Sequence, residues 1–199
     1  MSKVKKILFI NASPRKGGNT DIVLSKISNS IGKRAQSETI IINDLNFRPC
    51  QGCEECAEGA VCILDDDLGG IYKKIADSDV IIFGSPIYFG SLSSQAKMLI
   101  DRMQPFWVAK QKRLEEPSLT KEATLNIKRK KGFLVLVSGS SREYFFENAK
   151  QIIKNFFDVV NTQYCGQLFY AKIDKKGEIL DFPGIEKQAK DIAEAALEL

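Results

Sequence analysis

Four of the five cysteines lie close together, and their spacing resembles that of ligands for an iron–sulfur cluster. They follow the pattern C-x2-C-x2-C-x5-C within the segment 49–62: Cys50, Cys53, Cys56 and Cys62. Three thiolates spaced by two residues can wrap a [4Fe–4S] cluster, and the last cysteine can supply the fourth ligand. Zinc sites more often use two such pairs separated by a long spacer. The pattern therefore favours a [4Fe–4S] cluster, with free or redox-reactive thiols and zinc as the alternatives.

The chain contains no histidine, which restricts the chemistry that its side chains can perform. Histidine-based acid or base catalysis, Ser-His and Cys-His nucleophile pairs and imidazole-containing zinc sites are excluded. Chemistry must then rely on cysteines, carboxylates, backbone groups or a bound cofactor. We assign no side chain as catalytic.

The segment "NASPRKGGNT", residues 11–20, follows a first apolar run and combines many hydrogen-bond donors. Backbone amides at a helix N-terminus, together with hydroxyls and a basic side chain, form a favourable site for a phosphate. The segment matches neither G-x-x-x-x-G-K-[ST] nor G-x-G-x-x-G, which favours a lone terminal phosphate over a nucleoside triphosphate or a dinucleotide. The alternative is a glycine-rich turn that caps a helix and binds nothing. The donors of this candidate phosphate site come from Ser13, Gly17, Gly18, Asn19 and Thr20, and Arg15 or Lys16 adds positive charge.

A second segment, "GSPIYFGSLSSQAKMLIDR" at 84–102, carries flat apolar side chains beside exposed amides. A proline stiffens this turn, and a glycine permits close backbone approach. The combination suits a planar heterocycle with a polar edge, although the aromatic side chains can alternatively fill the core. The candidate ring-binding residues are Pro86, Ile87, Tyr88, Phe89 and Gly90. The small residues "SGSS" at 138–141, with Gly139 as the candidate site residue, are expected to form a third wall of the site.

These segments need a scaffold that brings them together, and the order of apolar runs predicts one. Short β-rich runs alternate with helical patterns, which indicates a doubly wound parallel α/β sheet with helices on both faces. The ligand of such a sheet lies beyond the carboxyl ends of its strands. We expect strands over 5–13, 37–45, 79–87, 131–139 and 162–173, and helices over 20–30, 65–78, 92–103, 142–160 and 184–199.

Two further expectations concern the second half of the chain. The connection 104–131 is long for such a fold, and we expect it to be a lid or a subunit contact, with Phe106 and Trp107 capping a pocket or packing on the body. Cys165 falls inside the last strand, where we expect a buried small hydrophobic residue.

Composition places the chain among single-domain soluble proteins. Its 199 residues, 44% hydrophobic and 27% charged, predict one domain over 1–199. The net charge of +4 includes the run "KRKK" at 128–131, which we expect to be a solvated surface and not a nucleic-acid site, because no aromatic residues interleave with it. Apolar runs are too short to cross a bilayer, and the N-terminal run is expected to be a strand and not a signal peptide. We expect a cytoplasmic location, where structural disulfides are improbable.

The two loop motifs with the cysteine pattern between them resemble the NADPH-dependent FMN reductase family of flavodoxin-like proteins, and within it the iron–sulfur flavoproteins. The resemblance covers residues 5–102 strongly and the rest through element order. It implies a flavodoxin-like five-stranded sheet of order 2-1-3-4-5. It also implies that the isoalloxazine ring of FMN lies against the 86–90 loop, and that its phosphate lies on Ser13, Arg15, Gly18, Asn19 and Thr20. Family members are usually dimers or tetramers in which a neighbouring subunit helps to enclose the flavin.

The resemblance implies an FMN-dependent oxidoreductase that takes electrons from NAD(P)H and passes them to the cluster or to a small-molecule or protein acceptor. An alternative within the fold is a pure electron carrier fed by ferredoxin, without a nicotinamide site. An alternative of a different class is a binding module that takes FMN or a phosphorylated ligand and acts as a redox sensor for a partner protein. The electron acceptor, the preference for NADH or NADPH and the oligomeric state are not set by the sequence.

Overall fold

The computed structural model describes residues 4–115 and 129–198 of the chain. Five parallel strands form the central sheet in the order β2-β1-β3-β5-β6, and β4 pairs antiparallel with β3. The predicted order of the five main strands is confirmed. The strands are β1 (Lys6–Asn11), β2 (Gln36–Ile41), β3 (Val80–Tyr88), β4 (Ser91–Leu92), β5 (Lys130–Val137) and β6 (Thr162–Tyr170).

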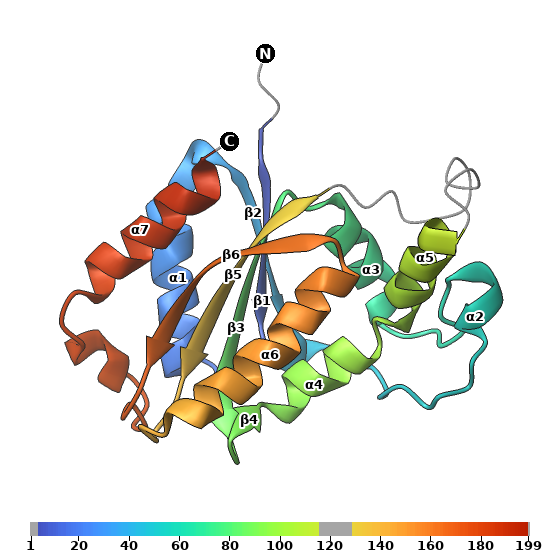
Figure 1. Ribbon diagram of the computed structural model, residues 1–199. Coiled ribbons are helices and arrows are strands. Elements are labelled where there is room, and N and C mark those ends of the chain that lie inside the picture. The colour runs from blue at the N-terminus through green and yellow to red at the C-terminus, as the bar shows by residue number, and fades with distance from the viewer. Residues whose placement is uncertain (1–3, 116–128, 199) are drawn as a thin grey trace.

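Helices cover both faces of the sheet (Figure 1). One face carries α1 (Asn19–Ile31) and α7 (Ile185–Leu197), whose apolar residues pack with the β1, β3 and β5 side chains that point to that face. The other face is covered by α3 (Leu68–Asp77), α4 (Ser94–Asp101), α5 (Gln104–Glu115) and α6 (Glu143–Val159). The central strands are buried on both faces, which explains their continuous apolar runs.

The β1 strand illustrates this two-sided burial. Its residues alternate between the two cores, with Leu8 and Ile10 in one and Ile7 and Phe9 in the other, and each of them is at most 2% exposed. The period of two along a strand sends neighbouring side chains to opposite faces. Because both faces of the sheet are apolar there, β1 is an interior strand between β2 and β3, and the first candidate ligand loop follows its carboxyl end.

The structure contains more elements than the five strands and five helices that the sequence predicted. The structure adds the two-residue strand β4, and it adds α2 (Cys56–Gly59) and α5 among the described residues. The predicted helix over 92–103 divides accordingly, because Leu92 pairs with Ile87 in β4 before Ser93 caps α4. Within residues 4–115 and 129–198, short 3-10 helices lie at Gly32–Arg34, Ile42–Asp44 and Glu178–Asp181.

The connection predicted over 104–131 begins as a helix, α5, in place of a loop. Phe106 is fully buried and packs on the body next to Tyr72, with ring centroids 6.1 Å apart, whereas Trp107 is 48% exposed. Residues 116–128 lie outside the described residues. The question of a lid or a subunit contact therefore stays a prediction.

The expectation that Cys165 is buried is wrong, because its side chain is exposed. The register between β5 and β6 shifts at Gly132/Phe133, whose partners are Tyr164 and Gly166, so Cys165 is the additional residue of a β-bulge. A bulged residue is left out of the ladder and can turn toward solvent. β6 is also an edge strand, so nothing in the described sheet covers it from that side.

The run "KRKK" is not uniformly solvated either. Lys130 begins β5, is 2% exposed and donates from Nζ to the carbonyl of Val160 at 2.7 Å. Lys131 donates to the carbonyls of Ala195 and Glu198 at the end of α7. These lysines bind terminal carbonyls of the protein itself, which leaves less charge for a partner.

Candidate functional site

A small cavity lies at the carboxyl ends of β1, β3 and β5, where a doubly wound sheet is expected to bind its ligand. Its volume is about 80 Å³. Ligand pockets that enclose a whole cofactor usually measure about 300–1,000 Å³, so this chain surrounds only part of such a ligand. The cavity is lined by Ser13, Arg15, Gly18, Asn19, Thr20, Pro86, Ile87, Tyr88, Val137, Gly139, Ile173 and Asp174.

The lining joins the three segments that the sequence indicated, and adds three residues outside them: Val137, which directly precedes the third segment, Ile173 and Asp174. Phe89 and Gly90 of the predicted set are outside the lining, at the tip of the β3–β4 hairpin. Ile173 and Asp174 were missed. They come from the segment after β6, where no glycine-rich or hydroxyl-rich motif marked a ligand site.

The first loop is shaped by side chains that bind its own backbone. Asn11 Oδ1 accepts from the amide of Ser13 at 3.0 Å, and Asn11 Nδ2 donates to Asp21 at 3.0 Å. Asp21 also accepts from the amide of Gly17 at 2.8 Å. These bonds fix the path of the loop before any ligand binds, which lowers the entropic cost of binding.

The N-terminus of α1 faces the cavity through Gly18, Asn19 and Thr20. The N-cap residue is Gly18, so no side chain caps the helix, and the first hydrogen bond of the helix runs from the amide of Ile22 to the carbonyl of Gly18. The amides before Ile22 have no acceptor one turn earlier in the helix, and together with the helix dipole they favour an anion.

Gly18 itself is required by close packing. A Cβ added there would lie 2.9 Å from the carbonyl oxygen of Arg15, a backbone atom that cannot move aside easily. The glycine thus closes the turn and leaves space on the cavity side. The donors of Ser13, Arg15, Gly18, Asn19 and Thr20 suit a phosphate group, and we call these five residues the phosphate cradle.

The side chain of Asn19 does not point its amide at a ligand. Its Nδ2 donates to the carbonyl of Lys175 at 2.9 Å, and its Oδ1 accepts from the amides of Gly177 and Ile179 at 2.9 and 3.3 Å. Asn19 therefore anchors the segment after β6 to α1 and places Ile173 and Asp174 beside the cavity. Its remaining contribution to an anion site is its backbone amide.

The β3–β4 hairpin presents aromatic side chains to solvent beside this phosphate cradle. Tyr88 is 37% exposed, and Phe89 is fully exposed with a backbone φ of 49°. A non-glycine residue in the left-handed region carries a conformational cost. An aromatic ring that stays in solvent also loses the free energy that burial of its apolar surface would provide. Gly90 follows with a φ of 75°, and an added Cβ there would lie 2.8 Å from the ring of Phe145. This flat, half-open wall suits one face of a planar ring.

Two buried serines that the sequence analysis did not single out as site residues hold the loops together. Ser93 Oγ donates to the carbonyl of Ala12 at 2.7 Å and accepts from the amide of Ala96 at 3.2 Å, so it caps α4 and binds the first loop. Ser85 Oγ accepts from the amide of Ser93 at 3.1 Å. Both serines are fully buried, so these bonds do not compete with solvent.

The four clustered cysteines lie in the segment 46–67, which we call the cysteine loop. It follows β2 in the chain and packs on α5, away from the phosphate cradle (Figure 1). Cys50 and Cys53 are exposed, and Cys56 and Cys62 are half-buried. Burial is the largest cause that raises the pKa of the Cys56 thiol above its usual value, and electrostatic interactions with the other three cysteines of the loop raise it further. Among the described residues, no three cysteines, histidines or carboxylates are gathered into a group that could hold a metal ion.

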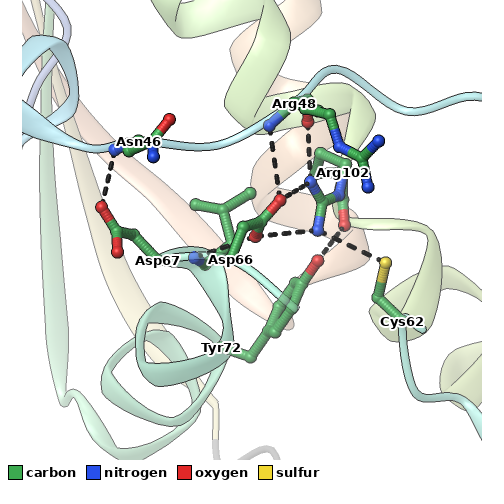
Figure 2. Close-up of polar contacts among 8 residues, drawn as sticks. Asn46, Arg48, Cys62, Asp66, Asp67, Tyr72 and Arg102 are labelled. Carbon is green, nitrogen blue, oxygen red and sulfur yellow. Dashed lines mark hydrogen bonds and ion pairs between the residues drawn. The ribbon is translucent and has the colours of Figure 1, made fainter. Parts of the chain in front are cut away.

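The ends of the cysteine loop meet at a buried ion pair that the sequence analysis missed (Figure 2). Arg102 is 1% exposed, and its Nη1 lies 2.6 Å from a carboxylate oxygen of Asp66. Nη1 also donates to the carbonyl of Arg48 at 2.6 Å, and Nη2 donates to the sulfur of Cys62 at 3.4 Å. Tyr72 Oη donates to the carbonyl of Arg102 at 3.0 Å.

The ion pair sets the charge state of its carboxylate. Burial alone would raise the pKa of Asp66, but the hydrogen bonds from Arg102 and from the amides of Arg48 and Leu68 outweigh it, so the pKa lies below its usual value. Asp66 is thus ionised at neutral pH. The Nε–H of Arg102 is buried with no hydrogen-bond partner among the described residues. An unmet buried donor costs about 1–3 kcal/mol, which favours one further hydrogen-bond acceptor at this nitrogen.

Comparison with known proteins identifies relatives of the chain. The family model described as NADPH-dependent FMN reductase matches residues 5–173. An iron-sulfur flavoprotein from Methanocaldococcus jannaschii is 37% identical over 153 residues, covering 76% of this chain and 71% of that protein. An iron-sulfur flavoprotein from Methanosarcina thermophila is 35% identical over 98 residues, and that match covers only 49% of this chain and 51% of that protein.

Solved structures agree on the fold. The NAD(P)H:quinone oxidoreductase from Methanothermobacter marburgensis superposes with a TM-score of 0.65, covering 96% of this chain and 95% of that one, at 14% sequence identity. At that identity the likeness shows the fold alone. In the described part of this chain, no helix combines the length and the apolar character needed to span a membrane.

Proposed function

Because the chain belongs to the NADPH-dependent FMN reductase family, we propose that it is an FMN-dependent oxidoreductase that accepts electrons from NAD(P)H. The observation that carries this proposal is the uncapped N-terminus of α1, which lies in one cavity with the residues of the β3–β4 hairpin that suit a planar ring. An anion site beside a flat, half-open wall matches the shape of a flavin mononucleotide.

The residues of the cradle would hold the phosphate of FMN. The hydroxyls of Ser13 and Thr20 line the cavity, as do the N-terminal residues of α1. Arg15 brings a positive charge, and its Nη1 donates to the carbonyl of Asp174 at 3.4 Å, which ties the first loop to the segment after β6. Fixed donors of this kind bind an anion without reorganising.

The hairpin residues would hold the ring. Pro86, Ile87 and Tyr88 line the cavity, and Phe89 extends the wall into solvent. FMN, when bound, supplies the redox chemistry, since it accepts a hydride from a reduced nicotinamide and returns the electrons to an acceptor. The protein has to align the nicotinamide over the open face of the ring, and such alignment needs no histidine.

The cysteine loop supports a second cofactor. Cys50, Cys53, Cys56 and Cys62 are free thiols, a suitable ligand set for a [4Fe–4S] cluster. The Arg102 guanidinium donates to the Cys62 sulfur, and its buried Nε–H has no acceptor among the described residues. These four cysteines would hold the cluster, which supplies one-electron transfer when bound. The relatives named iron-sulfur flavoprotein support this proposal by their names.

A second copy of the chain is part of the proposal. The chain encloses only about 80 Å³ at the strand ends and leaves Phe89 fully exposed. A neighbouring subunit that covers this hairpin would complete the flavin pocket. The acceptor is a small molecule or a protein.

An anaerobic titration tests this function. FMN is added to the chain, and NADPH or NADH is then added while the visible flavin band is followed. The proposal predicts tight FMN uptake and rapid bleaching by one of the nucleotides. Reduction by dithionite alone would favour the electron carrier over the reductase, and a chain that takes up no FMN would contradict both.

A further inference from the structure

The end of α4 contacts both stems of the cysteine loop through one side chain. The incoming stem contributes the carbonyl of Arg48, which accepts from Arg102 Nη1 at 2.6 Å. The outgoing stem contributes Cys62 Sγ at 3.4 Å from Nη2, and the carboxylate of Asp66 at 2.6 Å from Nη1 and 3.2 Å from Nη2. Figure 2 shows the guanidinium between these groups.

The remaining bonds between the stems lie at the same neck. The amide of Asn46 donates to Asp67 Oδ2 at 2.6 Å, and the amide of Asp67 donates back to the carbonyl of Asn46 at 3.4 Å. The amide of Arg48 donates to Asp66 Oδ2 at 3.3 Å. Asp66 thus joins the incoming stem to Arg102, and the stems are held together where the loop begins and ends.

Beyond the neck, the loop has few contacts with the rest of the molecule. Its short helix α2 packs on α5 through a small apolar cluster of Ala60, Val108 and Ala109 with Cys56. Cys50 and Cys53 are exposed. An irregular loop of this length loses much conformational entropy when its ends are fixed, so the neck determines how far the four thiols are preorganised.

The chemistry of the clamp requires an arginine. A guanidinium presents several donors in a planar fork, and here three of its partners lie in different directions around it. Lysine would preserve the charge but would lose the fork. Because Arg102 is 1% exposed and the Asp66 side chain 9%, water does not substitute for either partner.

We propose that Arg102 is a positioning residue that clamps the two stems of the cysteine loop and orients the Cys62 sulfur for cluster binding. The cluster part of this inference rests on the proposed function, whereas the clamp itself does not. The hydrogen bond from Arg102 Nη2 to Cys62 Sγ places a donor and a cation on one ligand sulfur. Hydrogen bonds to ligand sulfurs are among the factors that set the reduction potential of a cluster, and a nearby positive charge raises it.

The same helix connects this clamp with the flavin site. Ser93 at the start of α4 binds the carbonyl of Ala12 in the first loop, and Arg102 follows the last residue of α4, Asp101. A helix of eight residues extends about 12 Å. The two proposed cofactor sites are therefore attached to opposite ends of one short, rigid element.

The test compares Arg102→Gln and Arg102→Lys with a matched control, Arg34→Gln. Arg34 donates from Nη1 to both oxygens of Glu194 at 2.9 Å, but it is half-exposed and pairs with α7 on the other face of the sheet. Each FMN-loaded chain is reconstituted anaerobically with iron and sulfide. Four quantities are measured: FMN per chain, cluster per chain, cluster reduction potential, and amide hydrogen exchange over 46–68 before reconstitution.

The clamp predicts a local effect. Arg102→Gln is expected to speed exchange over 46–68 at least about tenfold and to weaken cluster binding about 10–100-fold, the usual range for lost outer-shell partners. Arg102→Lys is expected to fall between Arg102→Gln and wild type, with a reduction potential below that of wild type. FMN content and the exchange of sheet amides should stay at wild-type values, which shows that each variant is folded, and Arg34→Gln should match wild type throughout.

The outcomes separate the clamp from the proposed function. Wild-type exchange over 46–68 in both Arg102 variants would overturn the clamp. Wild-type cluster content and potential in both variants would overturn the orientation of Cys62. If the wild-type chain takes up FMN but no iron and sulfide, the proposed cluster fails and its orientation by Arg102 fails with it, while the exchange measurement still decides the clamp.

Discussion

The phosphate cradle and the cysteine loop are held in place by different means. The cradle lies at the end of a sheet whose strands β1, β3 and β5 are buried on both faces, and several independent bonds from Asn11, Asp21 and Ser93 fix its path. The cysteine loop is joined to the body mainly at one neck around Arg102. A site built on the sheet is protected by redundancy, whereas a site on a long loop depends on a few buried polar groups.

The largest expected effect is the loss of the ion pair at that neck. Arg102→Met leaves the Asp66 carboxylate buried without its partner, and breaking such a pair costs about 3–5 kcal/mol. Urea denaturation of the FMN-loaded chain measures the change in the free energy of unfolding. The double variant Arg102→Met/Asp66→Asn removes the uncompensated charge and is expected to recover at least half of the loss. If Arg102→Met lowers the free energy of unfolding by less than about 1 kcal/mol, or if the double variant recovers none of the loss, the ion pair at the neck does not hold the loop as described.

The proposed flavin site is best perturbed at a glycine that α1 packs against. A Cβ on Gly84 of β3 would lie 2.7 Å from Leu24 Cδ1 and 2.9 Å from Thr20 Cγ2, so Gly84→Ala should push the start of α1 away from the sheet. Overpacking of this kind costs about 1–3 kcal/mol, and FMN affinity should fall because Thr20 belongs to the cradle. Calorimetric FMN titration and urea denaturation measure the two effects.

The same substitution in α3 is the control. Gly70 is exposed, and an added Cβ there would meet no atom within 4 Å. Gly70→Ala is expected to stabilise the chain by about 0.5–1 kcal/mol, because alanine loses less backbone entropy in a helix. Two alanine substitutions with the same sign of effect would contradict this account of α1 packing.

A smaller effect at the same site is expected from the serine that caps α4. Ser93→Ala removes the donor to Ala12 and the acceptor of the Ala96 amide, and losing an N-cap costs about 0.5–2 kcal/mol. FMN affinity should fall because the first loop loses its tie to α4. Ser94→Ala is the matched control, since the Ser94 side chain is exposed and its Oγ bonds only to Gln95. Equal effects of the two variants would refute the role of Ser93.

The smallest expected effect comes from Tyr170 at the end of β6. Its hydroxyl is buried with no hydrogen-bond partner among the described residues, and burial raises its pKa from 10.0 to about 12. The folded state then retains a proton that the unfolded state releases, so this residue lowers stability as pH rises from about 10 to about 12. Tyr170→Phe should be neutral or stabilising by about 1 kcal/mol at neutral pH. Its advantage should grow above pH 10 in chemical denaturation, and a destabilised variant would reveal a missing partner.

The sequence predicted the parts of this molecule that depend on local pattern. The parallel α/β sheet and the joint cavity of the three loops followed from apolar runs and from glycine- and hydroxyl-rich turns, as Ser13, Thr20 and Pro86 illustrate, whereas the order of the strands was implied by the family resemblance. The prediction for α4 was nearly correct, because Ala96 and Leu99 lie on one apolar stripe. These features rest on residues that are neighbours in the chain.

Features that depend on distant partners were missed. The Arg102–Asp66 pair joins residues 36 positions apart, and a charged residue at the end of an amphipathic helix carries no sign of its partner. Cys165 lies in β6, as its sequence context predicted, but the β-bulge there leaves its side chain exposed. The short strand β4 arises where the turn after β3 folds back, which the apolar pattern around Leu92 did not distinguish from a helix start.

The most direct test of the central claim measures FMN, iron and sulfide in one anaerobic preparation each of the wild-type chain, Gly84→Ala and Arg102→Lys. The claim is that two separately held sites bind the two cofactors. It predicts that the wild-type chain contains both cofactors. Gly84→Ala should contain less FMN and keep its cluster, and Arg102→Lys should contain less cluster and keep its FMN. Parallel loss of FMN and cluster in both variants, or a wild-type chain that takes up no FMN, would contradict it.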